Sequence, residues 1–340
     1  MSQKEVSVFS KDLSGMIKGV AILMMLVHHC FAFPDFWLDD FRIGPILTVI
    51  SNNFKICVAV FAFITGYGFY AGRSSTYRAV IQKVFLFLGQ YWLQLFLIFL
   101  PVACISYTFS VEKILYNLVA LEDNIILFAW YVFFYCYVLL TFPLVKKLLN
   151  KGPAWDLAVV LAGGYGVTVF LYFLPFASPL RSMLIDCYCY YPVVGMGYLV
   201  AKYRVFDRIG HKISVPVALA LVVAVFLLRM KLSVVKGFTF DVIYAPLLIL
   251  ALCRVLEKCR FLHKGLLFLG KYSFHMWLFH SIFFSAYTRT VMQPLVYWSD
   301  LPVLRLLLVT AFSAGAAVMI DGLWRYILIL FGKMRNGIRR

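Results

Sequence analysis

The sequence has few charged residues. They make up 14% of its 340 residues, whereas a soluble domain carries about 25%. Acidic residues are the scarcest, with 15 Asp and Glu against 32 Lys and Arg, and hydrophobic residues reach 63%. A water-soluble fold of this length would lack the polar residues to cover its surface. This balance excludes a soluble enzyme, a disordered chain and an ordinary nucleic-acid-binding domain.

The sequence also lacks a CxxC pair, a low-complexity segment, a clear internal repeat and any polar stretch long enough for a separate soluble domain. Its eight cysteines are scattered, most of them in apolar runs, which predicts small buried side chains rather than a metal site or a disulfide framework. We therefore expect a single membrane domain over residues 1–340, with no metal and no permanently bound cofactor.

What the sequence does contain is apolar segments of about 20 residues, the length that crosses the hydrocarbon core of a bilayer. They predict an all-α, polytopic membrane protein with about ten transmembrane helices. The ten segments are residues 16–34, 44–71, 84–106, 125–145, 155–175, 184–201, 214–230, 238–256, 265–288 and 303–330.

The basic residues are distributed unevenly among the connections between these segments. On the side that holds both termini lie 23 Lys and Arg, against nine on the other side. Because cytoplasmic loops are enriched in Lys and Arg, both termini are predicted to be cytoplasmic, which requires an even number of spans. The net charge of +17 therefore needs no nucleic-acid partner, although a local basic patch remains open as a site for a phosphorylated ligand.

The first apolar segment carries Lys18, His28 and His29. Lys18 and His29 are eleven residues apart, so on an α-helix they share a face within about 20° and lie about 16 Å apart along the axis. His28 points about 80° away from Lys18. A snorkelling Lys18 and an interfacial histidine are the structural alternative. For paired histidines inside an apolar span we favour function, since histidine acts as a general base near neutral pH.

The first segment and several later ones resemble the membrane acyltransferases of acyltransferase family three, whose first span carries Arg-x10-His. Lys18-x10-His29 fits that pattern with Lys in place of Arg. The other matching stretches cover most of the chain. They are Val60–Tyr67, similar to FFxxSGY with Thr65 for Ser; Trp130-Tyr131, which opens the fourth span; the glycine-bearing Tyr191–Gly197; and Leu269–His280, similar to LGxxSxxxYLxH with Trp277 for Tyr.

The resemblance implies an O-acyltransferase of a bacterial cytoplasmic membrane. Acyl-CoA, with acetyl as the default, would donate from the cytoplasm to a hydroxyl of an extracytoplasmic glycan or its lipid-linked precursor. Lys18 and Lys83 would hold the CoA phosphates, and His29 would act as general base or transient acyl carrier. Asp35, Asp39 or Asp40 would orient the imidazole. The expected partners are thus acyl-CoA, a saccharide and the bilayer.

The chain departs from the family pattern on the approach to the third span, RRxxRIxPxY. Lys83 and Tyr91 are kept, but the arginine position before the proline is Leu86 and the proline is Gly89. Lysine is a point charge, whereas arginine binds phosphate through two donors. These departures point to weaker donor binding or a rearranged donor site.

Other polar residues at membrane depth have two interpretations each. Ser273 and His280 share a helix face and belong either to the acceptor site or to ordinary helix packing. Asp321 and Arg325 are predicted to pair at i, i+4. For Gln90, Gln94, Thr65 and Gly66 we favour a role in helix packing. Asn52, Asn53 and Lys55 are expected to lie in a solvated turn.

Two other functions stay open at this point. Ten spans with buried polar groups also fit a transporter or flippase, although matching halves with broken spans are not evident. The substitutions at Lys18 and Leu86 also leave room for a catalytically inactive relative of the acyltransferases.

Overall fold

The computed structural model describes residues 8–39, 41, 43–72, 76–175, 178–232, 234–235, 238–297 and 300–337. Helices make up nearly all of the regular structure of these residues, which confirms the all-α prediction. The exception is a two-residue antiparallel pair, β1 (Val234–Val235) and β2 (Phe238–Thr239). The chain divides into two compact units, each described by itself.

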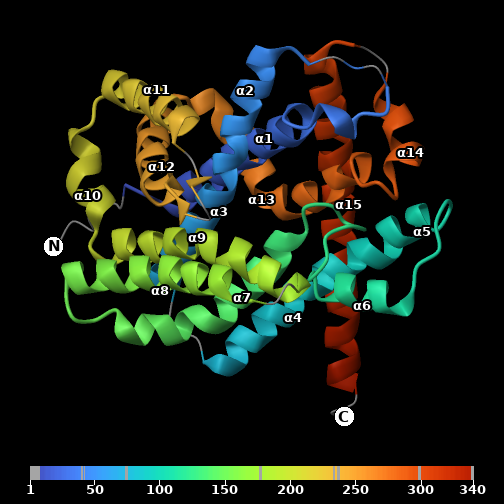
Figure 1. Ribbon diagram of the computed structural model, residues 1–340, viewed down its shortest axis with the longest axis horizontal. Helices are drawn as coiled ribbons and strands as arrows, with labels where there is room; N and C mark the ends of the chain where they lie inside the picture. Colours follow the sequence, from blue (N-terminus) through green and yellow to red (C-terminus); the bar gives the residue numbers. More distant parts are fainter. Residues whose placement is uncertain are drawn as a thin grey trace. The chain divides into compact units, whose positions relative to one another are not determined.

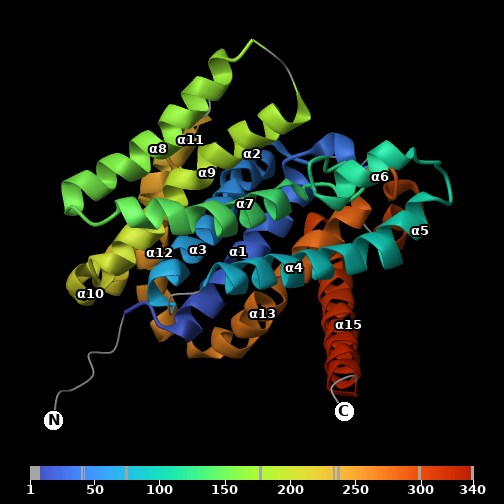
Figure 2. The ribbon, with the colours of Figure 1, turned by 90° about the horizontal axis from the view of Figure 1, so that it is seen from below.

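Unit 1 comprises Met1–Ala32, Pro45–Tyr77 and Phe134–Lys271. Within it α3 packs mainly on α9, α9 on α8 and α11 on α12 (Figures 1 and 2). Its helices are α1 (Lys11–Phe31), α2 (Pro45–Asn53), η2 (Phe54–Ile56), α3 (Cys57–Ala71), α7 (Trp130–Val145), η4 (Lys146–Leu148), α8 (Pro153–Phe173), α9 (Pro179–Lys202), α10 (Val205–Ile209), η5 (Gly210–Lys212), α11 (Val215–Lys231), α12 (Asp241–Lys258), η6 (Arg260–Leu262) and the first half of α13 (His263–His280).

Unit 2 comprises Phe33–Gly44, Arg78–Phe133 and Tyr272–Arg340. The π-helical segment η3 directly precedes α5, whose Pro101 has no backbone N–H for an α-helical bond. The helices of the unit are η1 (Pro34–Phe36), α4 (Tyr77–Gln94), η3 (Leu95–Phe99), α5 (Leu100–Ala103), α6 (Val111–Leu118), the second half of α13, η7 (Ser281–Phe283), α14 (Arg289–Met292), η8 (Gln293–Val296) and the unbroken α15 (Pro302–Gly337; Figure 2).

Glycines let helices of unit 1 approach each other backbone to backbone. A Cβ on Gly66 of α3 would overlap the carbonyl of Val194 on α9, and a Cβ on Gly197 of α9 would overlap the carbonyl of Phe63 on α3. The contact is therefore reciprocal, and only glycine fits at either position. The expectation that Gly66 serves helix packing is confirmed.

Two more helix pairs in unit 1 use the same device. Gly164 of α8 faces Pro192 of α9, while Gly270 of α13 meets the backbone of Gly15 on α1. These contacts leave no room for a side chain, so each fixes the separation of its helix pair. Five cysteines are buried among the packed helices, as expected of small apolar side chains: Cys30, Cys57, Cys187, Cys189 and Cys253.

Seven helices of the described residues are long and apolar enough to cross a membrane, or eight if the bent pair Val205–Lys212 and Val215–Lys231 is one span. Each of the ten predicted segments contains a helix, but the count of ten spans is not confirmed. The 18 residues of α12 include four charged ones, and the 18 of α13 include two lysines and three histidines, which lowers their hydropathy.

Two predicted boundaries are wrong for local reasons. The fourth segment becomes helical at Trp130 rather than at residue 125, because Phe128 has a left-handed backbone with φ of 70°. The ninth segment leaves α-helical geometry after His280 rather than at residue 288. There the hydroxyls of Ser281 and Thr288 bond nearby backbone carbonyls, at 2.8 and 2.6 Å, and compete with the helical ladder.

The glycine contacts generate a stability prediction. Gly66→Ala should lower the free energy of unfolding by about 2–3 kcal/mol, because the new methyl group forces α3 away from α9. Gly163→Ala on α8 is the matched control: its Cβ would enter open space, so the melting temperature should stay the same or rise slightly. Thermal unfolding of the purified protein in detergent measures both. Equal melting temperatures for the two variants would contradict the packing role.

Candidate functional site

The histidine pair lies at the C-terminal end of α1. This helix is uninterrupted from Lys11 to Phe31, as the Lys18–His29 spacing argument requires, and it starts where the Ser10 hydroxyl caps the N–H of Leu13 at 3.2 Å. His28 and His29 are both buried, with ring centroids 5.1 Å apart and ring planes at 46°. The two imidazoles are therefore close neighbours in a low-polarity environment.

His28 is held by the backbone of α2. Its Nδ1 lies 2.9 Å from the carbonyl oxygen of Ser51. Because a carbonyl only accepts hydrogen bonds, Nδ1 must carry the proton of this bond, and Nε2 is then the nitrogen with the lone pair in the neutral ring. The fold thus selects one tautomer for one member of the histidine pair.

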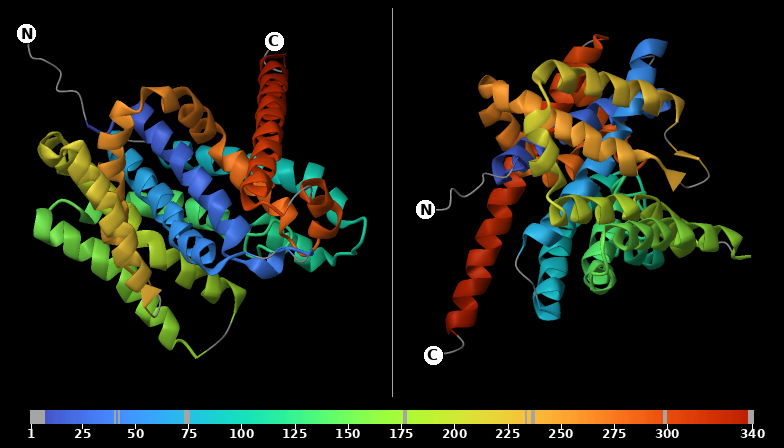
Figure 3. Two further views of the ribbon diagram at one scale, coloured as in Figure 1. Left: turned by 90° about the horizontal axis from the view of Figure 1, so that it is seen from above. Right: turned by 90° about the vertical axis from the view of Figure 1, so that its left-hand side faces the viewer.

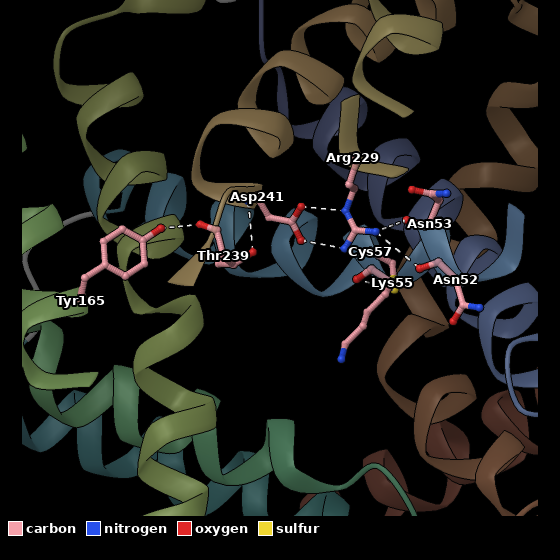
Figure 4. A network of polar contacts seen from close by, with 8 residues as sticks. All are labelled: Asn52, Asn53, Lys55, Cys57, Tyr165, Arg229, Thr239 and Asp241. Atoms are coloured by element: carbon pink, nitrogen blue, oxygen red, sulfur yellow. Dashed lines mark hydrogen bonds and ion pairs between the residues drawn. The ribbon is translucent and has the colours of Figure 1, made fainter. Parts of the chain in front are cut away.

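The next two carbonyls of the same helix end are bound by Arg229 of α11. Its Nη1 donates to the oxygens of Asn53 at 2.8 Å and Asn52 at 3.4 Å, as Figure 4 shows. Here the α-helical pattern of α2 changes to the 3-10 turn η2 within the continuous span Pro45–Ala71, and carbonyls at such a change of pattern can accept outside donors. His28 and Arg229 therefore bind three consecutive carbonyls.

Arg229 is fixed in turn by Asp241, the first residue of α12. Its Nε and Nη2 donate to the two carboxylate oxygens at 2.7 and 3.0 Å, and both side chains are buried. The hydroxyl of Thr239 accepts the backbone N–H of Asp241 at 3.1 Å, and Tyr165 of α8 donates to the carbonyl of Thr239. The α11–α12 hairpin that carries the pair is visible in Figure 3.

The role of this network was missed by sequence reasoning, which counted Arg229 only as one of the positive charges of the outer loops. A signal did exist. Arg229 falls within the apolar segment 214–230, and Asp241 follows near the start of the next segment. Opposite charges twelve residues apart, across a hairpin of two apolar helices, favour a buried pair. The accepting carbonyls, being backbone groups, leave no trace in the sequence.

The two lysines expected to bind phosphate lie in different units. Lys18 is half-buried on α1 in unit 1, beside Gly19, whose missing side chain allows close approach of the Leu266 backbone. Lys83 is exposed on α4 in unit 2. Leu86, at the position where the family pattern has arginine, is exposed on the same helix. A joint role of the lysines in donor binding stays a prediction.

The three carboxylates proposed to orient the imidazole differ in their surroundings. Asp35 is exposed in η1. Asp39 forms a two-pronged ion pair with Arg305 of α15, including a contact of 2.9 Å from Nη1 to Oδ1. Asp40 lies outside the described residues. Asp39 is thus already engaged with a buried cation.

Arg305 is the centre of a cation–aromatic cluster in unit 2. Only 1% of its side chain is exposed, and its guanidinium carbon lies 3.9 Å from the ring centroid of Phe41 and 5.0 Å from that of Trp37. Asp300 provides a second carboxylate at 3.3 Å. Burial raises the pKa of the nearby Tyr297 phenol, and the Asp39 charge adds to the effect. The cluster ties the start of α15 to the segment after η1.

Ser273 and His280 are both buried on α13. His280 stacks on Phe128 with centroids 6.0 Å apart and ring planes within 7° of parallel. The Phe128 backbone is strained, and the Phe128 ring packs on His280, a candidate residue of the site that binds the acyl acceptor. The choice between acceptor site and packing for Ser273 and His280 stays a prediction.

The remaining polar residues mostly have internal partners. Buried Gln94 of α4 contacts His275 of α13, with Nε2 and Nδ1 3.2 Å apart. Arg325 pairs with Asp321 at 2.8 Å, which confirms the i, i+4 prediction. Asn53 is buried rather than solvated, while Asn52 and Lys55 are exposed.

These features define a multi-pass helical membrane protein with a buried histidine pair beside the α2–η2 junction, whose carbonyls His28 and Arg229 bind. Comparison with known families matches residues 15–321 to the one described as Acyltransferase domain, so the chain belongs to acyltransferase family 3. No curated protein and no solved structure gives a match. The matched range includes α1 from Gly15 onward and runs through both units, so neither unit alone corresponds to the family domain.

The Arg305 cluster leads to a second stability prediction. Asp39→Asn should destabilise the protein by about 1–3 kcal/mol, because a buried guanidinium loses a charged acceptor. Asp35→Asn is the control and should leave the melting temperature unchanged, since Asp35 is exposed. Thermal unfolding of both variants in one detergent checks this. If Asp39→Asn melts like the wild type, Arg305 does not depend on Asp39.

Proposed function

We propose that the protein is an integral-membrane O-acyltransferase. It moves an acyl group, most simply acetyl, from cytoplasmic acyl-CoA to a hydroxyl of an extracytoplasmic glycan or its lipid-linked precursor. The observation that carries this proposal is the buried His28–His29 pair on α1, within the segment matched to the acyltransferase family.

In the proposed reaction His29 is the general base. The acceptor hydroxyl attacks the thioester carbonyl while His29 removes its proton, and the departing CoA thiolate takes that proton as the C–S bond breaks. In the alternative route a His29 nitrogen attacks the thioester carbon, and as the C–S bond breaks the N–H proton of the acylated ring passes to the CoA thiolate; the acceptor hydroxyl then attacks the acyl group, the C–N bond breaks, and the ring takes the hydroxyl proton. Both routes need a neutral imidazole, because only that form has a lone pair to accept the proton or attack the carbonyl carbon.

The donor would bind from the cytoplasmic side through Lys18 and Lys83. Their ammonium groups would pair with CoA phosphates as point charges, since both positions lack the two-pronged donor of arginine. The acceptor would be bound from the opposite side, with Ser273, His280 and Asp35 as candidate contacts. This direction assumes the orientation that the basic loops predict, with both termini in the cytoplasm of a bacterial cell.

The catalytic assignment predicts a loss of transfer without a loss of donor binding. His29→Ala should reduce transfer from radiolabelled acetyl-CoA to the glycan fraction of membrane vesicles by at least about 100-fold, because the base is gone. Calorimetry on the purified variant should still show saturable acetyl-CoA binding. His211→Ala is the matched control, an exposed histidine in η5 that should transfer normally. Full activity of His29→Ala would disprove the assignment.

The donor site generates a separate prediction about affinity. Lys18→Ala should weaken acetyl-CoA binding by roughly 10- to 100-fold, the loss of one charge-assisted contact, while Lys18→Arg should tighten it. Calorimetry in nanodiscs measures both. Binding that ignores both substitutions would place the phosphates elsewhere. A folded wild type that binds no acetyl-CoA would favour a transporter, a flippase or an inactive relative.

A further inference from the structure

We propose that Arg229 is a positioning residue for the histidine pair, acting through the backbone of α2. The inference rests on the proposed catalytic function of that pair. Arg229 binds the carbonyls of Asn52 and Asn53, and the adjacent carbonyl of Ser51 binds His28. One buried side chain thereby fixes the segment that sets the tautomer and the direction of an imidazole on another helix.

Arg229 divides its donors between two partners. Nε and Nη2 already satisfy both oxygens of Asp241, so the ion pair is complete without a third partner. Nη1 is directed at the end of α2 instead (Figure 4). A guanidinium can bind a carboxylate and a second acceptor group at once because its donors form a rigid fork, whereas an ammonium has no such fork.

The three accepting carbonyls are continuous along the chain. Ser51, Asn52 and Asn53 are consecutive and end α2, where the α-helical ladder changes to the 3-10 turn of η2. A shift of the last two carbonyls therefore also moves the Ser51 carbonyl, since planar peptide units transmit it. His28 would then lose the acceptor that holds Nδ1–H, while His29, one residue further along α1, would shift with the helix end.

The ion pair that supports this segment carries no net charge. Arg229 is neutralised by Asp241, and both are buried. A carbonyl orients an imidazole through hydrogen bonding without the charge of a carboxylate. The arrangement keeps His28 in the tautomer whose Nε2 carries the lone pair.

The kinetic test compares Arg229→Lys with the wild type in nanodiscs. Lysine keeps the positive charge for Asp241, but its one nitrogen cannot occupy the separate Nε, Nη1 and Nη2 positions from which arginine binds the carboxylate and the carbonyls. We expect kcat for acetyl transfer to fall roughly 10- to 100-fold, as expected for a misplaced catalytic group, while KM for acetyl-CoA stays unchanged. The double variant Arg229→Met/Asp241→Leu removes the buried charges without orphaning one, and should fold but show the same loss of kcat.

The matched control is the Lys202–Asp156 ion pair, which links α9 to α8 in the same unit with a contact of 2.6 Å and a fully buried carboxylate. Lys202→Met/Asp156→Leu removes an ion pair whose lysine is partly exposed and binds the carbonyl of Leu149, but none of the three carbonyls at the end of α2. It should leave kcat per folded molecule unchanged. If this control loses as much kcat as the Arg229 variants, the effect is general destabilisation and the positioning role is wrong.

A spectroscopic readout tests the same claim without activity. In protein labelled with nitrogen-15 histidine, the His28 ring, assigned with His28→Gln, should be the Nδ1–H tautomer in the wild type. Arg229→Lys should produce a mixture with the Nε2–H tautomer, and the control double variant should not. An unchanged tautomer together with an unchanged kcat in Arg229→Lys overturns the inference.

Failure of this inference is distinguishable from failure of the proposed function. If His29→Ala abolishes transfer but the Arg229 variants keep the wild-type kcat and tautomer, only the positioning role fails. If His29→Ala retains full transfer, the catalytic assignment fails, and a tautomer change in Arg229→Lys still shows that Arg229 sets the His28 ring. If neither variant changes anything, both are wrong.

Discussion

The need to satisfy backbone polar groups away from water governs unit 1. In an apolar environment a carbonyl without a donor costs several kcal/mol, so a break in a helix must be paired from elsewhere. At the junction between α2 and η2 the α-helical hydrogen-bonding pattern changes to a 3-10 turn within the span Pro45–Ala71, and its carbonyls accept donors from α1 and α11. The buried guanidinium of Arg229 then requires Asp241, and the carboxylate requires the hairpin that places it at the start of α12. The ion pair, the hairpin and the imidazole tautomer are connected through one backbone junction.

The reciprocal glycine contacts provide the rigidity that this junction needs. Apolar side chains have little hydrophobic preference for one another over lipid, so helices in a membrane associate through close packing and polar contacts. At Gly66 and Gly197 the backbones of α3 and α9 touch, and α3 continues directly from η2. Fixing α3 therefore also fixes the C-terminal side of the α2–η2 junction, while Arg229 fixes its N-terminal side. His28 therefore bonds a backbone segment that is held from both directions.

Much of this arrangement could be predicted from the sequence. Apolar length predicts the helices, eleven-residue spacing places Lys18 and His29 on one face of an unbroken α1, and i, i+4 spacing predicts the Asp321–Arg325 pair. What escaped prediction depends on the backbone. The left-handed backbone of Phe128 and the hydrogen-bonded carbonyl of Ser51 cannot be predicted from residue type, since neither position holds a glycine or a charged side chain. Arg229 had a visible signal, a charge inside an apolar segment, but its partners are main-chain oxygens.

Helix geometry makes the two adjacent histidines point in different directions. Neighbouring residues on an α-helix point about 100° apart, so two consecutive imidazoles cannot both address the same group. His28 faces α2 and is held there by Ser51, while the direction of His29 is the one that Lys18 shares. A carboxylate commonly fixes a catalytic imidazole in water-exposed enzymes, but here Asp241 is neutralised by Arg229 and Asp39 by Arg305. A backbone carbonyl orients a ring without placing another charge in an apolar site, and so avoids the free-energy cost of burying that charge at membrane depth. The histidine that is held by the carbonyl and the histidine that shares a helix face with Lys18 are therefore expected to have different roles.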